Sequence, residues 1–127
     1  MHSPFIGAGR RRSVSLLALT LLFVLPDSAR AVIRNVPGTY PTIQAGINAA
    51  AMFGDEVVIA NGTYTGAGNR DLLVNKHVVV RSASGDPALC IIDCQTLGRG
   101  FLISAVTNVA RIEGLTIKNA LTDEGGG

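Results

Sequence analysis

The sequence contains few of the residues that carry metal, redox or disulfide chemistry. Two cysteines in 127 residues are too few for a disulfide-dense miniprotein, and His77 is the only histidine after residue 31. A zinc site needs three or four ligands, and the few histidines and cysteines of this sequence do not suggest one. The G-x-S-x-G and H-E-x-x-H motifs are absent as well. We therefore assign no catalytic residue and no metal ligand.

Charge is also scarce, and it is unevenly placed. Charged residues make up 16% of the chain and hydrophobic residues 47%, a composition that excludes a disordered polypeptide. The formal net charge is +2, but four of the eleven basic residues precede residue 32. Seven basic and eight acidic residues follow. The remainder lacks the basic footprint of a nucleic-acid-binding protein, so we expect no nucleic acid as a partner.

Long apolar runs are limited to one, Val14–Leu25, near the N-terminus. Arg10–Arg12 precede it, and the small residues Ala29 and Ala31 follow it in an A-x-A pattern. This order is typical of a secretory signal peptide, and the run is shorter than the roughly 20 residues that a membrane span needs. We predict a signal peptide over residues 1–31, cleaved after Ala31. The mature chain would have no membrane span and would be secreted or otherwise extracytoplasmic, in a periplasm, on a cell surface or outside the cell.

A short helical pattern follows the lead-in to the mature chain. Four apolar residues share one helical face: Ile43, Ile47, Ala50 and Ala51. Thr42 is a suitable N-cap, and Gly54 suits the left-handed position after a helix. The pattern predicts a helix over Thr42–Phe53, which would be marginal in water unless it packs against another element.

Short β-rich segments with turn residues between them occupy the rest of the chain. Seven are apparent: Val57–Ile59, Leu72–Val74, Val78–Val80, Cys90–Ile92, Phe101–Ile103, Val109–Ile112 and Leu115–Ile117. Strands at intervals near ten residues predict an all-β fold, either a sandwich, a barrel or a solenoid.

Internal repetition favours the solenoid. Val57–Gly62 can be laid on Leu115–Ala120, which places Asn61 and Asn119 at the same position, and Val78–Ser82 fits the frame with serine there. Stacked asparagines at a strand exit can bond to one another and to turn backbone. We therefore predict a structural stack of Asn61 and Asn119. Short apolar runs are common, so the repetition alone leaves the sandwich and the barrel open.

Four segments carry a family resemblance. Tyr40–Ala50 and Gly54–Tyr64 resemble the N-terminus of right-handed parallel β-helix proteins of the pectin-lyase-like superfamily. Cys90–Gln95 and Ile112–Asn119 are similar to coils of the same group. The resemblance implies an all-β, right-handed parallel β-helix, a solenoid whose open end is shielded by an N-terminal capping α-helix.

The resemblance also implies a domain organisation. Residues 32–55 would form the extended lead-in and capping helix, and residues 56–127 the first coils of a β-helix that is truncated at its C-terminal end. In similar enzymes the catalytic residues and calcium ligands lie in central coils, beyond this region. No cofactor is therefore expected, and calcium would enter only if downstream coils resemble those of lyases.

The family that this chain resembles is functionally mixed, and it includes polysaccharide lyases, pectinesterases and surface proteins. Three functions stay open, one of which is a free-standing small binding module. The chain is an exported scaffold segment that binds carbohydrate or a surface, without catalysis of its own. Alternatively, it is the N-terminal part of a polysaccharide-degrading enzyme, similar to a pectate lyase or a pectinesterase, whose active coils lie downstream.

Three basic residues are candidates for ligand binding on an outer face of the solenoid: Arg81, Arg111 and Lys118. Similar enzymes bind acidic sugars there, and arginine pairs with carboxylates through two hydrogen bonds. The expected partner is thus a polysaccharide or a cell-surface glycan. Outward charges would equally keep a solenoid soluble. The oligomeric state is left open by the sequence.

Two further features have alternative interpretations. A disulfide between Cys90 and Cys94 needs a turn near Asp93, because four residues of straight strand span about 13 Å and bridged Cα atoms lie within about 7 Å. Without that turn the thiols are small apolar fillers. The acidic pairs Asp55–Glu56 and Asp123–Glu124 are expected to be solvated turn charges, since neighbours on a strand face opposite sides.

Overall fold

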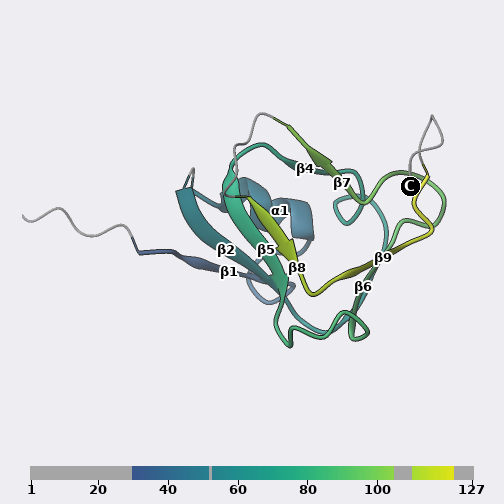
Figure 1. Ribbon diagram of the computed structural model, residues 1–127, viewed down its shortest axis with the longest axis horizontal. Helices are drawn as coiled ribbons and strands as arrows, with labels where there is room; N and C mark the ends of the chain where they lie inside the picture. The colour runs from purple at the N-terminus through teal and green to yellow at the C-terminus, as the bar shows by residue number, and fades with distance from the viewer. Residues whose placement is uncertain (1–29, 52, 105–109, 122–127) are drawn as a thin grey trace, which may run out of the picture.

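In the computed structural model, residues 30–51, 53–104 and 110–121 are described, and they contain nine short strands and one helix (Figure 1). The strands form three sheets. Sheet A contains β1 (Ile33–Val36), β2 (Phe53–Ile59), β5 (His77–Ser82) and β8 (Arg111–Glu113). Sheet B contains β3 (Gly62–Tyr64), β6 (Cys90–Asp93) and β9 (Thr116–Lys118), and sheet C contains β4 (Leu72–Val74) and β7 (Phe101–Ile103).

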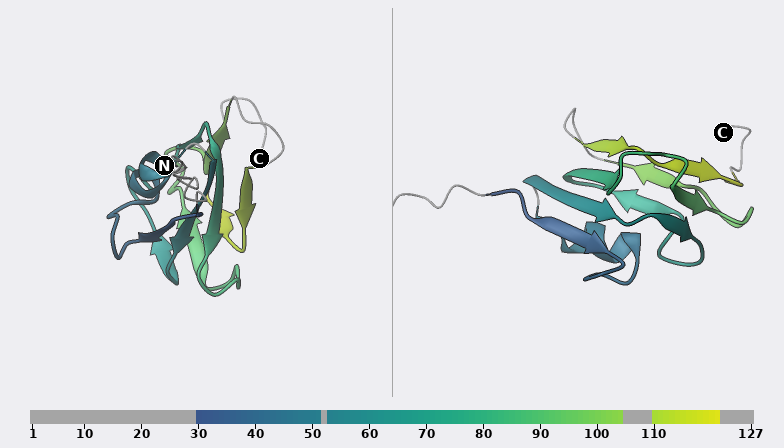
Figure 2. Two further views of the ribbon diagram at one scale, coloured as in Figure 1. Left: turned by 90° about the vertical axis from the view of Figure 1, so that its left-hand side faces the viewer. Right: turned by 90° about the horizontal axis from the view of Figure 1, so that it is seen from below.

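The chain passes through the three sheets in rotation, as a solenoid requires. β2, β3 and β4 form one turn, β5, β6 and β7 lie on them, and β8 and β9 lie on those in turn. Every strand pair is parallel, with Val57, Val80 and Ile112 at one level of sheet A. Figure 2 shows the turns as successive layers. The fold is a parallel β-solenoid of about three turns, so the predicted all-β, parallel solenoid architecture is confirmed.

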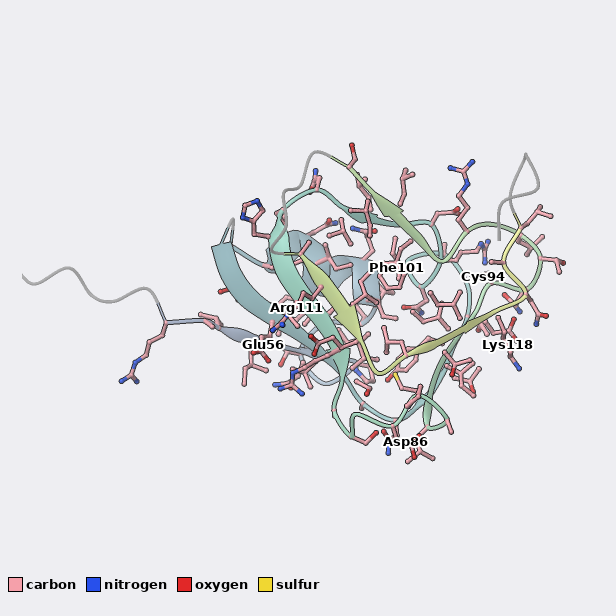
Figure 3. All side chains as sticks on the ribbon, viewed as in Figure 1. Glu56, Asp86, Cys94, Phe101, Arg111 and Lys118 are labelled. Carbon is pink, nitrogen blue, oxygen red and sulfur yellow. The ribbon has the colours of Figure 1, made fainter. Side chains whose placement is uncertain are left out.

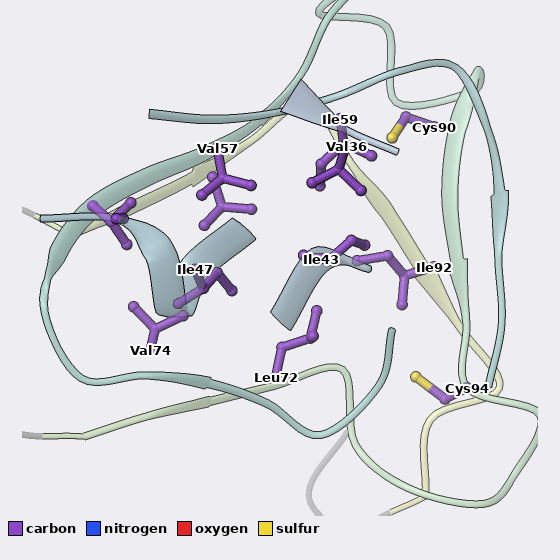
Figure 4. Close-up of a cluster of buried hydrophobic side chains, with 13 residues drawn as sticks. Val36, Ile43, Ile47, Val57, Ile59, Leu72, Val74, Cys90, Ile92 and Cys94 are labelled. Atoms are coloured by element: carbon purple, nitrogen blue, oxygen red, sulfur yellow. The ribbon is translucent and has the colours of Figure 1, made fainter. Parts of the chain in front are cut away.

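The core fills the space between the three sheets (Figure 4). Successive residues of a strand point to opposite faces, and β5 accordingly alternates between buried and half-buried side chains. Thirteen side chains form the buried cluster: Val36, Ile43, Ile47, Ala50, Val57, Ile59, Leu72, Val74, Val78, Val80, Cys90, Ile92 and Cys94. No single turn could bury its own inner face, so stacking of the turns makes the core.

The helix α1 (Ile43–Ala49) covers one end of this core, beside β1, β2 and β4. Thr42 is its N-cap, as predicted, and accepts a hydrogen bond at Oγ1 from the Ala45 N–H at 3.2 Å. Ile43 and Ile47 are fully buried. A Cβ on Gly46 would lie 3.0 Å from side-chain carbons of Val36 and Val57, so glycine lets the helix approach the sheet closely.

The helix is shorter than the predicted Thr42–Phe53. It ends at Ala49, where Ala50 turns to an extended conformation. Gly54 has a φ of +86°, yet it lies inside β2, where the register with β5 shifts, and not at a helix end. A glycine with positive φ is typical of a β-bulge as well as of a helix C-terminus. The expected boundary between residues 55 and 56 therefore falls inside a strand.

All seven predicted segments coincide with strands, although the bounds differ by up to four residues. Residues 105–109, which include the start of the predicted Val109–Ile112 segment, lie outside the described residues. Two strands were not predicted. β1 forms from the extended lead-in, and β3 includes Gly62 and Thr63, which follow Asn61 in a segment expected to separate strands.

Candidate functional site

The outer side of sheet A carries a set of alternating charges. Four residues make up this charged face: Glu56 on β2, Arg81 on β5, and Arg111 and Glu113 on β8. The register places Glu56, Val79 and Arg111 in one row across the sheet, and Val58, Arg81 and Glu113 in the next outward row. Figure 3 shows Glu56 and Arg111 over sheet A. Two of the three predicted ligand-binding residues therefore share one surface.

Both arginines of the charged face contact a carboxylate through Nε. Arg81 Nε lies 2.8 Å from Glu56 Oε2 on the neighbouring strand, and Arg111 Nε lies 3.1 Å from Glu113 Oε1 on its own strand. All four side chains are at least partly exposed, so each pair contributes at most about 1 kcal/mol to stability. The carboxylates orient the guanidinium groups, and the charge of the face sums to zero.

Lys118 does not join the charged face. It lies on β9 in sheet B, and its Nζ is 3.6 Å from Asp93 Oδ2 (Figure 3). Asp93 also accepts hydrogen bonds from Asn119 Nδ2 at 2.8 Å and from the Gln95 N–H at 3.0 Å. The Asn119 and Gln95 bonds lower the pKa of the Asp93 carboxyl. Asp93 therefore organises the turns that follow β6 and β9.

The register does not bring Asn61 and Asn119 together. Gly62 pairs with Cys90, so Asn61 lies level with Leu89, and Lys118 pairs with Asp93, so Asn119 lies level with Cys94. Leu89 and Cys94 are five positions apart, which at a rise of about 3.3 Å per residue is about 16 Å of extended chain. The predicted stack is therefore wrong, and Asn119 bonds to an aspartate of the neighbouring turn instead.

Asp55 is buried, contrary to the expectation of a solvated turn charge. Its side chain is 3% exposed and accepts hydrogen bonds from the Val32 N–H at 3.0 Å, the Ala51 N–H at 2.8 Å and Arg34 Nη2 at 2.9 Å. Arg34 Nη1 in turn donates to Tyr40 Oη at 3.2 Å. The backbone hydrogen bonds from Ala51 and Val32 are the main reason that the pKa of Asp55 is lowered. This cluster ties the lead-in strand to β2 and to the end of α1.

The two cysteines are free thiols and form no disulfide, so the alternative of small apolar fillers applies. Cys90 and Cys94 are both buried, on either side of Ile92 (Figure 4). The chain does turn after Asp93, but Cys94 keeps facing the interior. Burial raises the pKa of both thiols, which disfavours the reactive thiolate. They act as apolar fillers of the core.

A surface groove of about 320 Å³ lies at a corner of the solenoid near sheet C. Six residues line it: Asp71, Leu97, Gly98, Arg99, Leu102 and Leu121. The Asp71 N–H donates to the Arg99 carbonyl at 2.6 Å, and the Arg99 N–H donates to Asp71 Oδ1 at 2.8 Å. The carboxylate therefore holds the neighbouring turns together. Across residues 30–51, 53–104 and 110–121, no three His, Cys, Asp or Glu side chains converge on one point.

Residues 1–29 of the predicted signal peptide, with Ala29 among them, lie outside the described residues, whereas Ala31 is described and is exposed. In the described part of the chain, no helix has the length and apolarity needed to cross a membrane.

The fold and the charged face define a parallel β-solenoid with a capping helix and two oriented arginines on the outer side of sheet A. Comparison with protein-family models, with curated proteins and with solved structures gave no match.

Proposed function

We propose that the chain is an exported β-solenoid scaffold whose charged face binds a polysaccharide or a cell-surface glycan. The observation that supports this is the arrangement of Arg81 and Arg111. They lie on adjacent strands of one sheet, and a carboxylate contact at Nε orients each guanidinium.

An arginine can contact a carboxylate in a bidentate manner through two of its N–H groups. In Arg81, Nε contacts Glu56 and Nη1 donates to the Ser82 carbonyl at 3.3 Å, which leaves Nη2 for a ligand. In Arg111 the carboxylate contact uses Nε, and the side chain is 67% exposed. Glu56 and Glu113 can accept hydrogen bonds from sugar hydroxyl groups at the same surface. Because charges of both signs alternate there, the face suits a ligand with hydroxyl and carboxylate groups, such as an acidic polysaccharide.

The Arg81→Gln variant should bind polygalacturonate about three- to tenfold more weakly than the wild type, because one charged hydrogen-bonding group is lost from a partly exposed site. Isothermal titration of the purified protein measures the change. A neutral polysaccharide of similar length serves as the comparison ligand and should show a smaller difference between the two proteins.

Arg70→Gln is the matched control, since Arg70 lies before β4 and away from the charged face. It should bind as the wild type does. Equal affinity of Arg81→Gln and wild type, or no affinity of the wild type for either polysaccharide, contradicts the proposed site. Release of unsaturated uronides during the titration would instead favour a lyase.

Export has its own test. Arg10–Arg12, the apolar run Val14–Leu25 and the A-x-A pattern support cleavage after Ala31. When the full precursor is expressed in a bacterial host, N-terminal sequencing of the exported protein should begin at Val32. Replacing Ala31 with a bulky residue such as phenylalanine should leave the precursor uncut. A wild-type precursor that stays uncut in the cytoplasm would refute export.

A further inference from the structure

The last strands expose side chains that point toward the solenoid axis. Ile103 pairs with the buried Val74 but is 53% exposed, and Ile117 pairs with the buried Ile92 but is 43% exposed. Phe101, Ile112 and Leu115 pack on the core and are half-buried. We call these five residues the end face. Their counterparts one turn below are buried, so the end face is a core surface that no described residue covers.

The opposite end of the solenoid is closed. There α1 lies over the core and buries Ile43 and Ile47 completely. At the edge strand β1, the Asn35 carbonyl accepts hydrogen bonds from the Thr39 and Tyr40 N–H groups at 2.9 and 3.0 Å. Among the described strands, β8 ends sheet A on the other side and pairs only with β5. In the described part of the chain, the β8 end therefore offers a strand edge beside exposed inward-facing apolar side chains, whereas α1 covers the core at the other end.

The sequence of β8 is complementary to itself in the antiparallel direction. It reads Arg111, Ile112, Glu113, with both charged side chains exposed and Ile112 on the core side. If two β8 strands pair antiparallel about Ile112, each Arg111 faces a Glu113 across the strands. Opposite charges in directly facing positions stabilise an antiparallel pair, and like charges destabilise it.

We propose that the end face binds a second copy of this chain, end to end, with β8 antiparallel to β8 of the second copy. The two-fold axis passes through the β8 pair, perpendicular to sheet A. This rotation exchanges the other two sides of the solenoid, so β9 meets β7 of the second copy.

The heights of these strands match. In a solenoid that rises steadily as it winds, β9, the strand after β8, stands above the level of β8, and β7, the strand before it, stands below. On both sides of the dimer, β9 of one copy therefore faces β7 of the other copy. Ile117 on β9 comes to lie with Phe101 and Ile103 on β7 of the second copy, which covers the end face. The interface is isologous, and since α1 closes each outer end, assembly stops at the dimer.

The dimer does not depend on glycan binding. It joins sheet A of both copies into one sheet, and the charged face continues across the joint.

Sedimentation velocity of the purified chain at micromolar concentrations tests the interface. The wild type should sediment at twice its monomer mass. Arg111→Glu and Glu113→Arg should each raise the dissociation constant at least about tenfold, because each places like charges opposite one another twice. An equimolar mixture of the two variants should regain the dimer, since opposite charges then face each other in both cross-strand contacts.

Asp86→Arg is the matched control, because it replaces an acidic residue with arginine, as Glu113→Arg does, at an exposed turn between β5 and β6. It should dimerise as the wild type does. A wild type that is monomeric at all concentrations, or that forms aggregates without a defined mass, overturns the proposal. So does a mixture that stays monomeric while both variants retain the β-sheet circular dichroism of the wild type.

Discussion

The Ile47→Ala variant is expected to lose about 3 kcal/mol of the free energy of unfolding. Ile47 is fully buried on α1, and Figure 4 shows it between Val57 and Val74. Alanine would remove three methyl or methylene groups from that contact and leave a cavity between helix and sheet. Urea unfolding followed by circular dichroism measures the loss as a lower midpoint with an unchanged slope.

Ile33→Ala provides the comparison for this experiment. Ile33 is the same residue type on β1, but 53% of it is exposed, so its replacement should change the free energy of unfolding by no more than about 0.5 kcal/mol. If both variants lost equal stability, α1 would not be acting as the cover of the core. Comparing the two variants thus distinguishes the stability lost when a side chain buried under the helix is shortened from the stability lost when an exposed isoleucine is replaced.

The sheets were predictable from the sequence because most inward-facing positions of the strands are apolar. Segments such as Leu72–Val74 and Val78–Val80 contain β-branched and aliphatic residues at alternate positions, and both became strands. Thr42 as the N-cap was predictable from local chemistry, since its hydroxyl can accept a hydrogen bond from the first turn of the helix.

The level of each strand in the stack was not predictable, because the turns differ in length. Val57 and Val80 are 23 residues apart and Val80 and Ile112 are 32 apart, yet the three share one level. Aligning segments of similar sequence therefore placed Val57 of sheet A level with Leu115, although Leu115 directly precedes β9 of sheet B. The predicted asparagine stack failed for this reason, and not because asparagine is unsuited to such turns: Asn119 does occupy a left-handed position.

Local patterns also have more than one structural outcome. Gly54 has the positive φ that was predicted, but a bulge in β2 uses it instead of a helix end. Asp55 lies two positions before the inward-facing Val57. Because side chains two positions apart on a strand share a face, the inward direction of Asp55 was predictable from the sequence. Its partner Arg34 lies 21 residues away on β1, a strand that the sequence did not reveal.

Asp55→Asn should lower the free energy of unfolding by about 2–3 kcal/mol. Asp55 Oδ1 accepts from Val32, and Oδ2 accepts from Arg34 and Ala51, so both oxygens face donors. An asparagine amide would turn an NH₂ group toward one of these donor sets and leave Arg34 without its counter-charge. Urea unfolding at neutral pH measures the loss, and Asp86→Asn, at an exposed turn, should stay within about 0.5 kcal/mol of wild type.

The pH dependence of stability separates the charge of Asp55 from its shape. Its hydrogen bonds hold the folded-state pKa below the value of about 3.9 for an unperturbed aspartate, so the unfolded chain takes up the proton first. The contribution of Asp55 is therefore complete above the unfolded pKa and disappears as the pH falls through the folded pKa. Wild type should lose stability more steeply than Asp55→Asn between about pH 5 and pH 2, and the two curves should converge at the acid end. The lowered pKa of Asp93 adds a slope of the same sign to both proteins, so it cancels in the comparison.

Parallel curves would mean that the carboxylate charge contributes nothing to the joint between β1, β2 and α1, and that the loss in Asp55→Asn comes from hydrogen-bond geometry alone.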